Sequence, residues 1–332
     1  MEQTLFIARE SAIRFWRWYR IHSDIFNEPL KTQIKSPEHC AYTQSKINEL
    51  MKRLALPPGS TPESVFGKTL HIATACSKTR SFACNIKSHV WPLPPMTGSF
   101  LQLSNNVFVE SPEVCLLQTI SFLPVAKSLM LAMEFSGTYT YIDQNYQGSY
   151  IYSLQPLIQK ETLLTDIESF SKVHGSFLNK AFRTFGYMED GSASVMETRI
   201  YLLMTLPHKY GGYGLKHPVM NYAMNRQGKP VRPTTPGCIK PDFYWAENKL
   251  ALEYNSLQYH NGMPEYERDA ERREHLEKLG IRVIPVSRQK VYDPEQFDAL
   301  IKDIATTMKH RLRLPKTFVQ KRNSLRNAIL LS

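Results

Sequence analysis

Two carboxylates near residue 250 are spaced so that a β-hairpin would bring them together. Residues 241–255 read PDFYWAENKLALEYN, with β-prone segments on both sides of a turn at Glu247-Asn248. A turn centred there places Asp242 directly opposite Glu253. Cross-strand partners have Cβ atoms about 4.5–5.5 Å apart, which is close enough for two carboxylates to share one hard cation such as Mg²⁺ or Mn²⁺.

The same register predicts which other side chains accompany the pair. Lys240 falls opposite Asn255, and alternation places both on the face that carries Asp242 and Glu253. Two anions held so close repel each other unless a cation compensates them. A structural alternative therefore stays open, in which Lys240 forms an ion pair on a solvated sheet face, and a register slip of one residue would remove the arrangement altogether.

A third carboxylate lies in a helix-start signal upstream. Residues 194–197 read Ser-Val-Met-Glu, the pattern of a capping box in which Glu197 reaches back to the first backbone N–H of a helix. A functional role for Glu197 stays open beside this structural one.

Basic residues follow the hairpin. Arg268 and Arg272 are one helical turn apart and share a face suited to clamping a phosphate, although each could instead pair with Asp269 or Glu265. Residues 304–332 contain no acidic residue, and their basic residues are Lys309, Arg311, Arg313, Lys316, Lys321, Arg322 and Arg326. Such a tail could follow a nucleic-acid backbone or serve solvation alone.

The elements that must position these groups form an α/β pattern. From Ser194 onward the predicted order is helix, three strands, helix (265–279), strand (281–287) and helix (294–311). We predict a domain boundary near Gly191, an α/β domain over 191–312 with a mixed sheet flanked by helices, and a basic tail over 313–332.

Residues 1–190 are expected to form an α+β domain of unknown role. Its predicted helices and β-type runs are helices at 10–19, 36–54 and 173–187, short β-type runs within 69–109, an apolar helix pair within 112–133, and a connecting stretch at 137–160. Lys78, Arg80, Lys87 and His89 lie between the β-type runs and could meet phosphates, but scattered surface charge is the preferred account of them.

Composition sets limits on function. The 332 residues carry a formal net charge of +11, which favours a polyanionic partner such as nucleic acid. Five cysteines without a C-x-x-C pair indicate neither a disulfide framework nor a zinc knuckle. The most apolar stretch, 114–135, is interrupted by Gln118, Pro124 and Lys127, so no membrane span is expected. Without a secretory signal at the N-terminus, the expected location is cytoplasmic.

A family resemblance becomes specific over about residues 190–310. This segment resembles the PD-(D/E)XK nuclease superfamily, and within it the uncharacterised bacterial proteins related to very-short-patch-repair endonucleases. The matching motifs are Ser194 with Glu197, Pro241-Asp242, Glu253-Tyr254-Asn255-Ser256 with His260, and Arg268-Asp269 with Arg272. More loosely, the N-terminal region resembles one found with such domains in actinobacterial proteins, some of them labelled as abortive-infection antitoxins.

The resemblance implies a restriction-endonuclease-like core that hydrolyses phosphodiesters, with DNA as the expected substrate. Asp242 and Glu253 would hold Mg²⁺ or Mn²⁺, with Glu197 reaching the metal or its water. His260 would act as a general acid or base, since imidazole titrates near neutrality, or as a packing histidine.

Position 255 departs from the family pattern. Asn255 stands where the superfamily has Lys and the nearer relatives usually have Asp, and an amide can neither carry positive charge nor act as a base. Lys240 could compensate from across the hairpin. The alternatives to a metal-dependent endonuclease are therefore a non-catalytic nucleic-acid-binding or antitoxin-like regulator on a nuclease fold, and a protein-interaction module.

Overall fold

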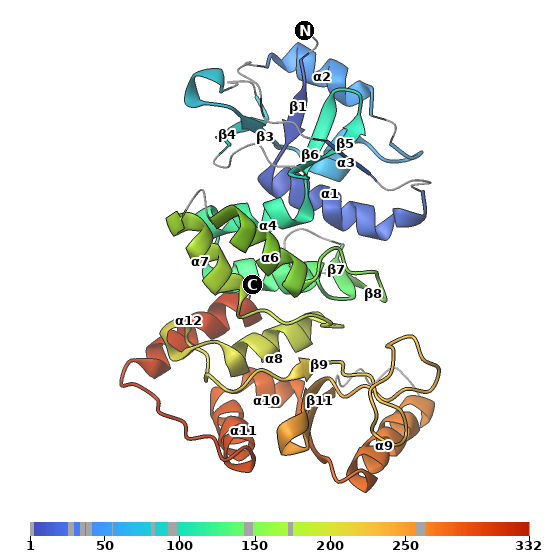
Figure 1. The fold of residues 1–332 in the computed structure, drawn as a ribbon, viewed down its shortest axis with the longest axis vertical. Helices are drawn as coiled ribbons and strands as arrows, with labels where there is room; N and C mark the ends of the chain where they lie inside the picture. Colours follow the sequence, from blue (N-terminus) through green and yellow to red (C-terminus); the bar gives the residue numbers. More distant parts are fainter. Residues whose placement is uncertain are drawn as a thin grey trace. The chain divides into compact units, whose positions relative to one another are not determined.

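The computed structural model of the chain contains two compact units (Figure 1). The first, here the N-terminal unit, comprises Met1–Pro124 and Thr140–Gly186, and the second, the C-terminal unit, comprises Val125–Tyr139 and Tyr187–Ser332. The structure describes residues 3–25, 30–33, 37, 42–54, 56–80, 84–91, 98–142, 149–171, 175–255 and 263–331. Helices and mixed sheets make up the chain, which confirms the expected α/β class.

A mixed sheet of order β2-β5-β6-β1-β3-β4 forms the core of the N-terminal unit. Its strands are β1 (Leu5–Ile7), β2 (Lys31–Gln33), β3 (Leu70–Thr74), β4 (Ile86–Val90), β5 (Phe100–Ser104) and β6 (Val107–Glu110). Central β1 is buried at every residue and pairs in parallel with β6 and antiparallel with β3. A strand covered on both faces accommodates such an unbroken apolar run.

Helix α1 (Arg9–Ile21) follows β1 directly and confirms the helix predicted over 10–19. It buries Phe15 and Trp16, and the indole N–H of Trp16 donates to the backbone carbonyl of Glu110 at 2.8 Å. The remaining helices of this unit are α2 (Gln44–Lys52), α3 (Pro62–Phe66), α4 (Pro112–Phe122), α6 (Lys160–Ser171) and α7 (Gly175–Phe185).

The apolar helix pair predicted within 112–133 divides between the units. Helix α4 ends before Leu123-Pro124, because the ring of Pro124 cannot continue a helix. Its partner α5 (Val125–Phe135) belongs to the C-terminal unit. The stretch expected only to connect, 137–160, contains β7 (Tyr139–Tyr141) and β8 (Tyr150–Tyr152), which pair with each other.

The C-terminal unit is built on a mixed sheet of order β12-β11-β10-β9. Its strands are β9 (Val219–Met220), β10 (Phe243–Trp245), β11 (Leu250–Asn255) and β12 (Arg282–Ser287), and its helices are α5, α8 (Val195–Thr205), α9 (Met263–Lys278), α10 (Arg288–Tyr292), α11 (Pro294–Thr307) and α12 (Phe318–Leu330). Because β11 and β12 run parallel, the chain must cross over between them, and α9 makes the crossover. The predicted order of elements from Ser194 is confirmed, with α10 and α12 added.

The prediction of a basic tail over 313–332 is wrong for residues 318–330, which form the packed helix α12. Helix α12 contacts α5 and α8, and it buries Phe318, Leu325 and Ile329. Arg322 forms an ion pair with Asp298, and Arg326 donates to the backbone carbonyls of Val291 and Tyr292.

These arginines serve packing, because their stems line a buried helix face and their heads find acceptors inside the unit. Lys309, Arg311 and Arg313, by contrast, are exposed. Among the described residues no helix has the length and apolarity needed to cross a membrane.

Candidate functional site

The hairpin of β10 and β11 has the predicted register. Phe243 pairs with Leu252 and Trp245 with Leu250, so the next pair outward would join Asp242 to Glu253. The turn differs in detail, because a 3-10 turn at Ala246–Asn248 is closed by Lys249 at φ 46°. Its four residues remain centred on Glu247-Asn248, which is why the pairing is unchanged.

Asp242 stands at the start of β10, where it is tied to the neighbouring strand. Its Oδ2 accepts the backbone N–H of Tyr254 at 2.7 Å, and its carbonyl accepts the N–H of Asn221 at 3.1 Å. Burial raises the pKa of the Asp242 carboxyl well above its usual range, and the negative charges of Glu197 and Glu253 raise it further. The Tyr254 N–H and the Arg272 guanidinium lower this pKa, but they do not offset the rise. Three carboxyl groups therefore lie close enough to oppose one another's ionisation.

Glu253 is the most buried of the three, with 1% of its surface exposed. Alternation along β11 puts it on the same face as Ala251, which packs against Leu276 of α9. Arg272 lies one helical turn before Leu276, and its Nη2 donates to Oε2 of Glu253 at 2.8 Å. The other oxygen, Oε1, is buried and has no hydrogen-bond partner among the described residues.

Glu197 lies in the first turn of α8. Ser194 caps this helix by accepting the Glu197 N–H, and Oε2 of Glu197 reaches back to the N–H of Ala193 at 2.9 Å. The predicted back-bonding is thus present, one residue before the cap. The same oxygen accepts the side-chain amide of Asn221 at 2.6 Å. Asn221 therefore connects Glu197 with the backbone of Asp242, and burial raises the pKa of the Glu197 carboxyl.

The other predicted site residues have more varied placements. Asn255 ends β11, half-buried and paired with Ser287 of β12. Lys240 is half-buried and precedes β10. Among the described residues, the first residue that pairs with β11 is Phe243, so Lys240 lies before the paired part of the hairpin. His260 and the side chain of Arg268 lie outside the described residues.

Sequence reasoning missed the partner of Arg272 and the whole role of Asn221. Arg272 was expected to face phosphate or to pair with Asp269 or Glu265, and the structure shows its guanidinium in contact with Glu253. No spacing rule reveals this contact, because it depends on how α9 lies across the sheet. For Asn221 the residue type gives one hint. Its backbone has a φ of 48°, and Asn is enriched among non-glycine residues with positive φ.

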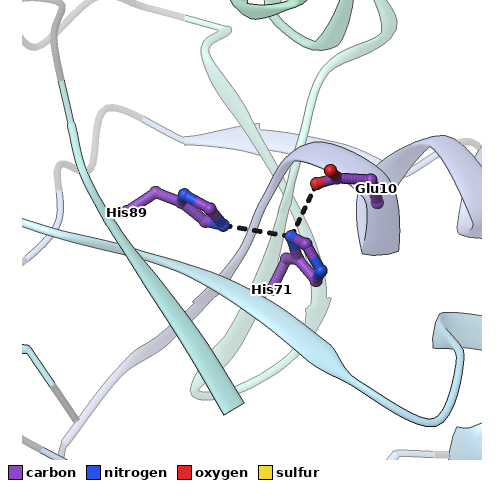
Figure 2. Close-up of side chains that lie close together, drawn as sticks. All are labelled: Glu10, His71 and His89. Carbon is purple, nitrogen blue, oxygen red and sulfur yellow. Dashed lines mark hydrogen bonds and ion pairs between the residues drawn. The ribbon is translucent and has the colours of Figure 1, made fainter. Parts of the chain in front are cut away.

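A second cluster of chemically capable side chains lies in the N-terminal unit. One atom each from Glu10, His71 and His89 lie within 4.8 Å of one another (Figure 2). The sequence drew attention only to His89, and only as surface charge. Its partners come from separate elements, so local spacing could not have revealed them.

Comparison with known proteins gives little functional information. No family model matches the chain, and no solved structure matches it. Two uncharacterised proteins from two strains of Mycobacterium tuberculosis are each 32% identical to the chain over 98 residues. The match covers 29% of this chain and 31% of each relative.

Proposed function

We propose that the C-terminal unit is a divalent-metal-dependent phosphodiesterase that cleaves nucleic acid, with DNA as the expected substrate. The observation that carries the proposal is the carboxyl of Glu253: 1% exposed, beside two other carboxyl groups, with Oε1 unpartnered among the described residues. Burial of an acceptor without a partner costs about 1–3 kcal/mol, and such an atom calls for an explanation, of which a bound ion is one.

The residues fit a hard divalent cation. Oxygen-only ligands from two or three carboxylates are what Mg²⁺ and Mn²⁺ prefer, and the repulsion that raises the pKa of Asp242 would be relieved by a positive ion. We assign Asp242 and Glu253 as ligands, with Glu197 close by. A metal held there would polarise a phosphate and lower the pKa of a bound water.

Other side chains would hold this site in shape. Arg272 orients Glu253 through Oε2 and leaves Oε1 for the ion. Asn221 fixes Glu197 and the backbone of Asp242 together. These are positioning residues, and their value lies in holding the carboxylates still before substrate arrives. Lys240 is the candidate for the positive charge that Asn255 cannot supply, and His260 for proton transfer.

The proposed substrate follows from charge. A net charge of +11 attracts polyanions, and Lys309, Arg311 and Arg313 are exposed in the same unit as the carboxylates. Phosphate contacts of this kind bind without reading bases. A cytoplasmic location for this activity is part of the proposal and rests on cysteine usage.

The test is cleavage of duplex, nicked, mismatched and single-stranded DNA with Mg²⁺ or Mn²⁺. Asp242→Ala should abolish metal-dependent cleavage, whereas Glu247→Gln should leave it unchanged, because Glu247 is an exposed carboxylate of the same hairpin paired with Lys216. Cleavage that survives Asp242→Ala and chelation alike would overturn the proposal.

Two observations support a second candidate, a nucleic-acid-binding regulator that does not cut. Arg272 already supplies one positive partner to Glu253, and Asn255 lacks the charge expected at its position. This candidate predicts that the protein binds DNA without cleaving it and that Mn²⁺ does not bind at Glu253. Calorimetric titration of Mn²⁺ therefore separates the two functions.

A further inference from the structure

Three side chains of the N-terminal unit converge from separate elements (Figure 2). His71 lies on β3 and His89 on β4, where the parallel pairing of Ala73 with His89 puts both histidines on one face. The two rings approach with Nε2 of His89 3.0 Å from Nδ1 of His71. Glu10, in the first turn of α1, brings its Oε2 to 2.6 Å from the same Nδ1.

Hydrogen bonds alone cannot give all the facing nitrogen and oxygen atoms of these three side chains a partner. Nδ1 of His71 carries either one proton or one lone pair, and it faces two neighbours. A proton on Nδ1 must be shared between Glu10 and His89, whereas a proton on Nε2 of His89 leaves the Nδ1 lone pair facing the carboxylate. Oε2 of Glu10 is buried and makes no aligned hydrogen bond among the described residues, despite its short distance to His71.

We infer that Glu10, His71 and His89 form a binding site for a divalent transition-metal ion of the Zn²⁺ class. A cation is a partner that all three lone pairs can bind at once. Two imidazoles and one carboxylate suit Zn²⁺, Co²⁺ or Fe²⁺ rather than Mg²⁺. Three protein ligands are also the number with which zinc sites leave a fourth position for water or substrate.

The fold holds the three groups close together and partly away from water. His71 is 7% exposed, so its ring is held in place by the fold. Burial, with the nearby charges of Arg9 and His71, lowers the pKa of His89 to about 4. Burial raises the pKa of Glu10, but the close contact with His71 and the charge of His71 outweigh the burial and lower that pKa to about 2.

Two positive side chains oppose the cation. Arg9 and Lys87 both act on His89 electrostatically, whereas Glu10 supplies the single negative charge among the ligands. Lys87 is exposed, so its repulsion is partly screened by solvent and salt. The site is therefore tunable: removal of the Lys87 charge should strengthen metal binding without any contact to the metal.

The test uses the full chain, stripped with a chelator and titrated with Co²⁺, whose visible absorption reports imidazole coordination. His89→Ala and Glu10→Gln should each weaken Co²⁺ binding by about 100-fold, because even outer-shell partners cost about 10–100-fold. Lys87→Gln should strengthen it about twofold to fivefold, which corresponds to about 0.4–1 kcal/mol and suits an exposed charge. Zn²⁺ should displace Co²⁺ in competition.

Controls separate this site from the carboxylate site of the C-terminal unit. Glu253→Gln should leave the Co²⁺ spectrum and affinity unchanged, and so should His22→Asn, which alters a histidine at the end of α1. Circular dichroism verifies folding, and Glu10→Gln keeps the test decisive if His89→Ala does not fold. Co²⁺ binding that is absent from the wild type, or unchanged in both ligand variants, would overturn the inference.

Discussion

Each unit holds a glutamate away from water, and the two differ in what surrounds the carboxyl. Glu110, at the end of β6, is fully buried. Its Oε2 accepts the backbone N–H of Arg9 at 2.8 Å, and its Oε1 accepts the side-chain amide of Gln118. Glu253 is as buried, yet one of its oxygens has only Arg272 and the other has no partner among the described residues.

The difference lies in how many hydrogen bonds each buried carboxyl makes and in which charges surround it. Burial raises the pKa of Glu110 to about 8, even though its hydrogen bonds lower it, so this carboxyl is protonated at neutral pH and acts as a neutral bridge between β6 and α4. Around Glu253 the described residues include two further carboxyl groups and the guanidinium of Arg272. Burial by itself therefore marks no site, and the proposal for Glu253 rests on the oxygen that has no partner among the described residues.

The largest effect is expected for Glu253→Gln, which keeps the size of the side chain and removes its charge. Removal of one preorganised group that stabilises developing charge costs about 100- to 1,000-fold in rate, and a metal ligand should fall at the upper end, about 4 kcal/mol. Mn²⁺ affinity should fall together with cleavage. Glu110→Gln is the matched control and should change neither. Equal losses in the two variants would break the comparison.

The second prediction concerns pH. The pKa of Glu110 is higher in the folded chain, about 8, than its ordinary value of 4.5, so the folded state retains a proton that the unfolded state loses. The resulting stability is fully present below about pH 4.5 and is lost as pH rises towards 8. Since one pKa unit corresponds to about 1.4 kcal/mol, the loss should be on the order of a few kcal/mol.

Denaturant unfolding at several pH values measures this loss, and Glu110→Gln should remove it. The difference between wild type and variant isolates Glu110 from other groups that titrate in the same range, such as Asp242, whose pKa is also raised. Identical pH profiles for the two proteins would show that Glu110 is ionised when folded.

Local rules were sufficient for the hairpin and insufficient for its surroundings. The pairing of Phe243 with Leu252 follows from a turn whose centre the residue types indicate, because register in a hairpin is fixed within a few residues. The helix caps at Ser194 and Ser111 are local in the same way. The α/β class could be predicted for this reason.

Contacts between distant elements could not be predicted. His71 and His89 meet because β3 and β4 pair in parallel, and the register of a parallel pair is not set by a turn. Arg272 reaches Glu253 only through the placement of α9 on the sheet. Arg322 and Arg326 were assigned to a basic tail because their spacing does not distinguish such a tail from a packed helix.

The third prediction tests Arg272 as the compensating charge. Arg272→Ala leaves the Glu253 carboxylate, 2% exposed, without its cation. Removal of one partner from a buried pair costs about 3–5 kcal/mol, and since the side chain of Arg272 is 33% exposed we expect about 2 kcal/mol in the free energy of unfolding. Arg282→Ala should cost under about 1 kcal/mol, because its pair with Asp303 is about half exposed on both sides.

Mn²⁺ gives this prediction a second readout. An ion that binds the folded site stabilises it by mass action, about 2.7 kcal/mol at 100 times its dissociation constant. Arg272→Ala should gain more stability from Mn²⁺ than wild type does, because in the variant the ion replaces the positive charge that Arg272 supplies to Glu253 in the wild type. An Arg272→Ala variant as stable as wild type, or insensitive to Mn²⁺, would contradict the role given to Glu253.

The smallest expected effect concerns basic side chains, which can also be divided into buried and exposed ones. Within the C-terminal unit Arg322 and Arg326 are buried and bonded to the protein, whereas Lys309, Arg311 and Arg313 are exposed. Only the exposed set is available to phosphate. Deletion of the tail would remove α12 and its packing, so substitution of the three exposed residues by glutamine is the informative change.

Each phosphate contact adds about 0.9 to the slope of log affinity against log salt on duplex DNA. The triple variant should flatten this slope by about 2–3 and weaken binding at low salt, with much less effect at high salt, where screening has already removed the contribution. The control removes the same charge from the N-terminal unit by glutamine substitution of three exposed residues, Lys68, Lys78 and Arg80. If the DNA binds to the C-terminal unit, only the variant of Lys309, Arg311 and Arg313 changes the slope. Equal slopes in both variants would mean that net charge alone, and not these side chains, attracts the DNA.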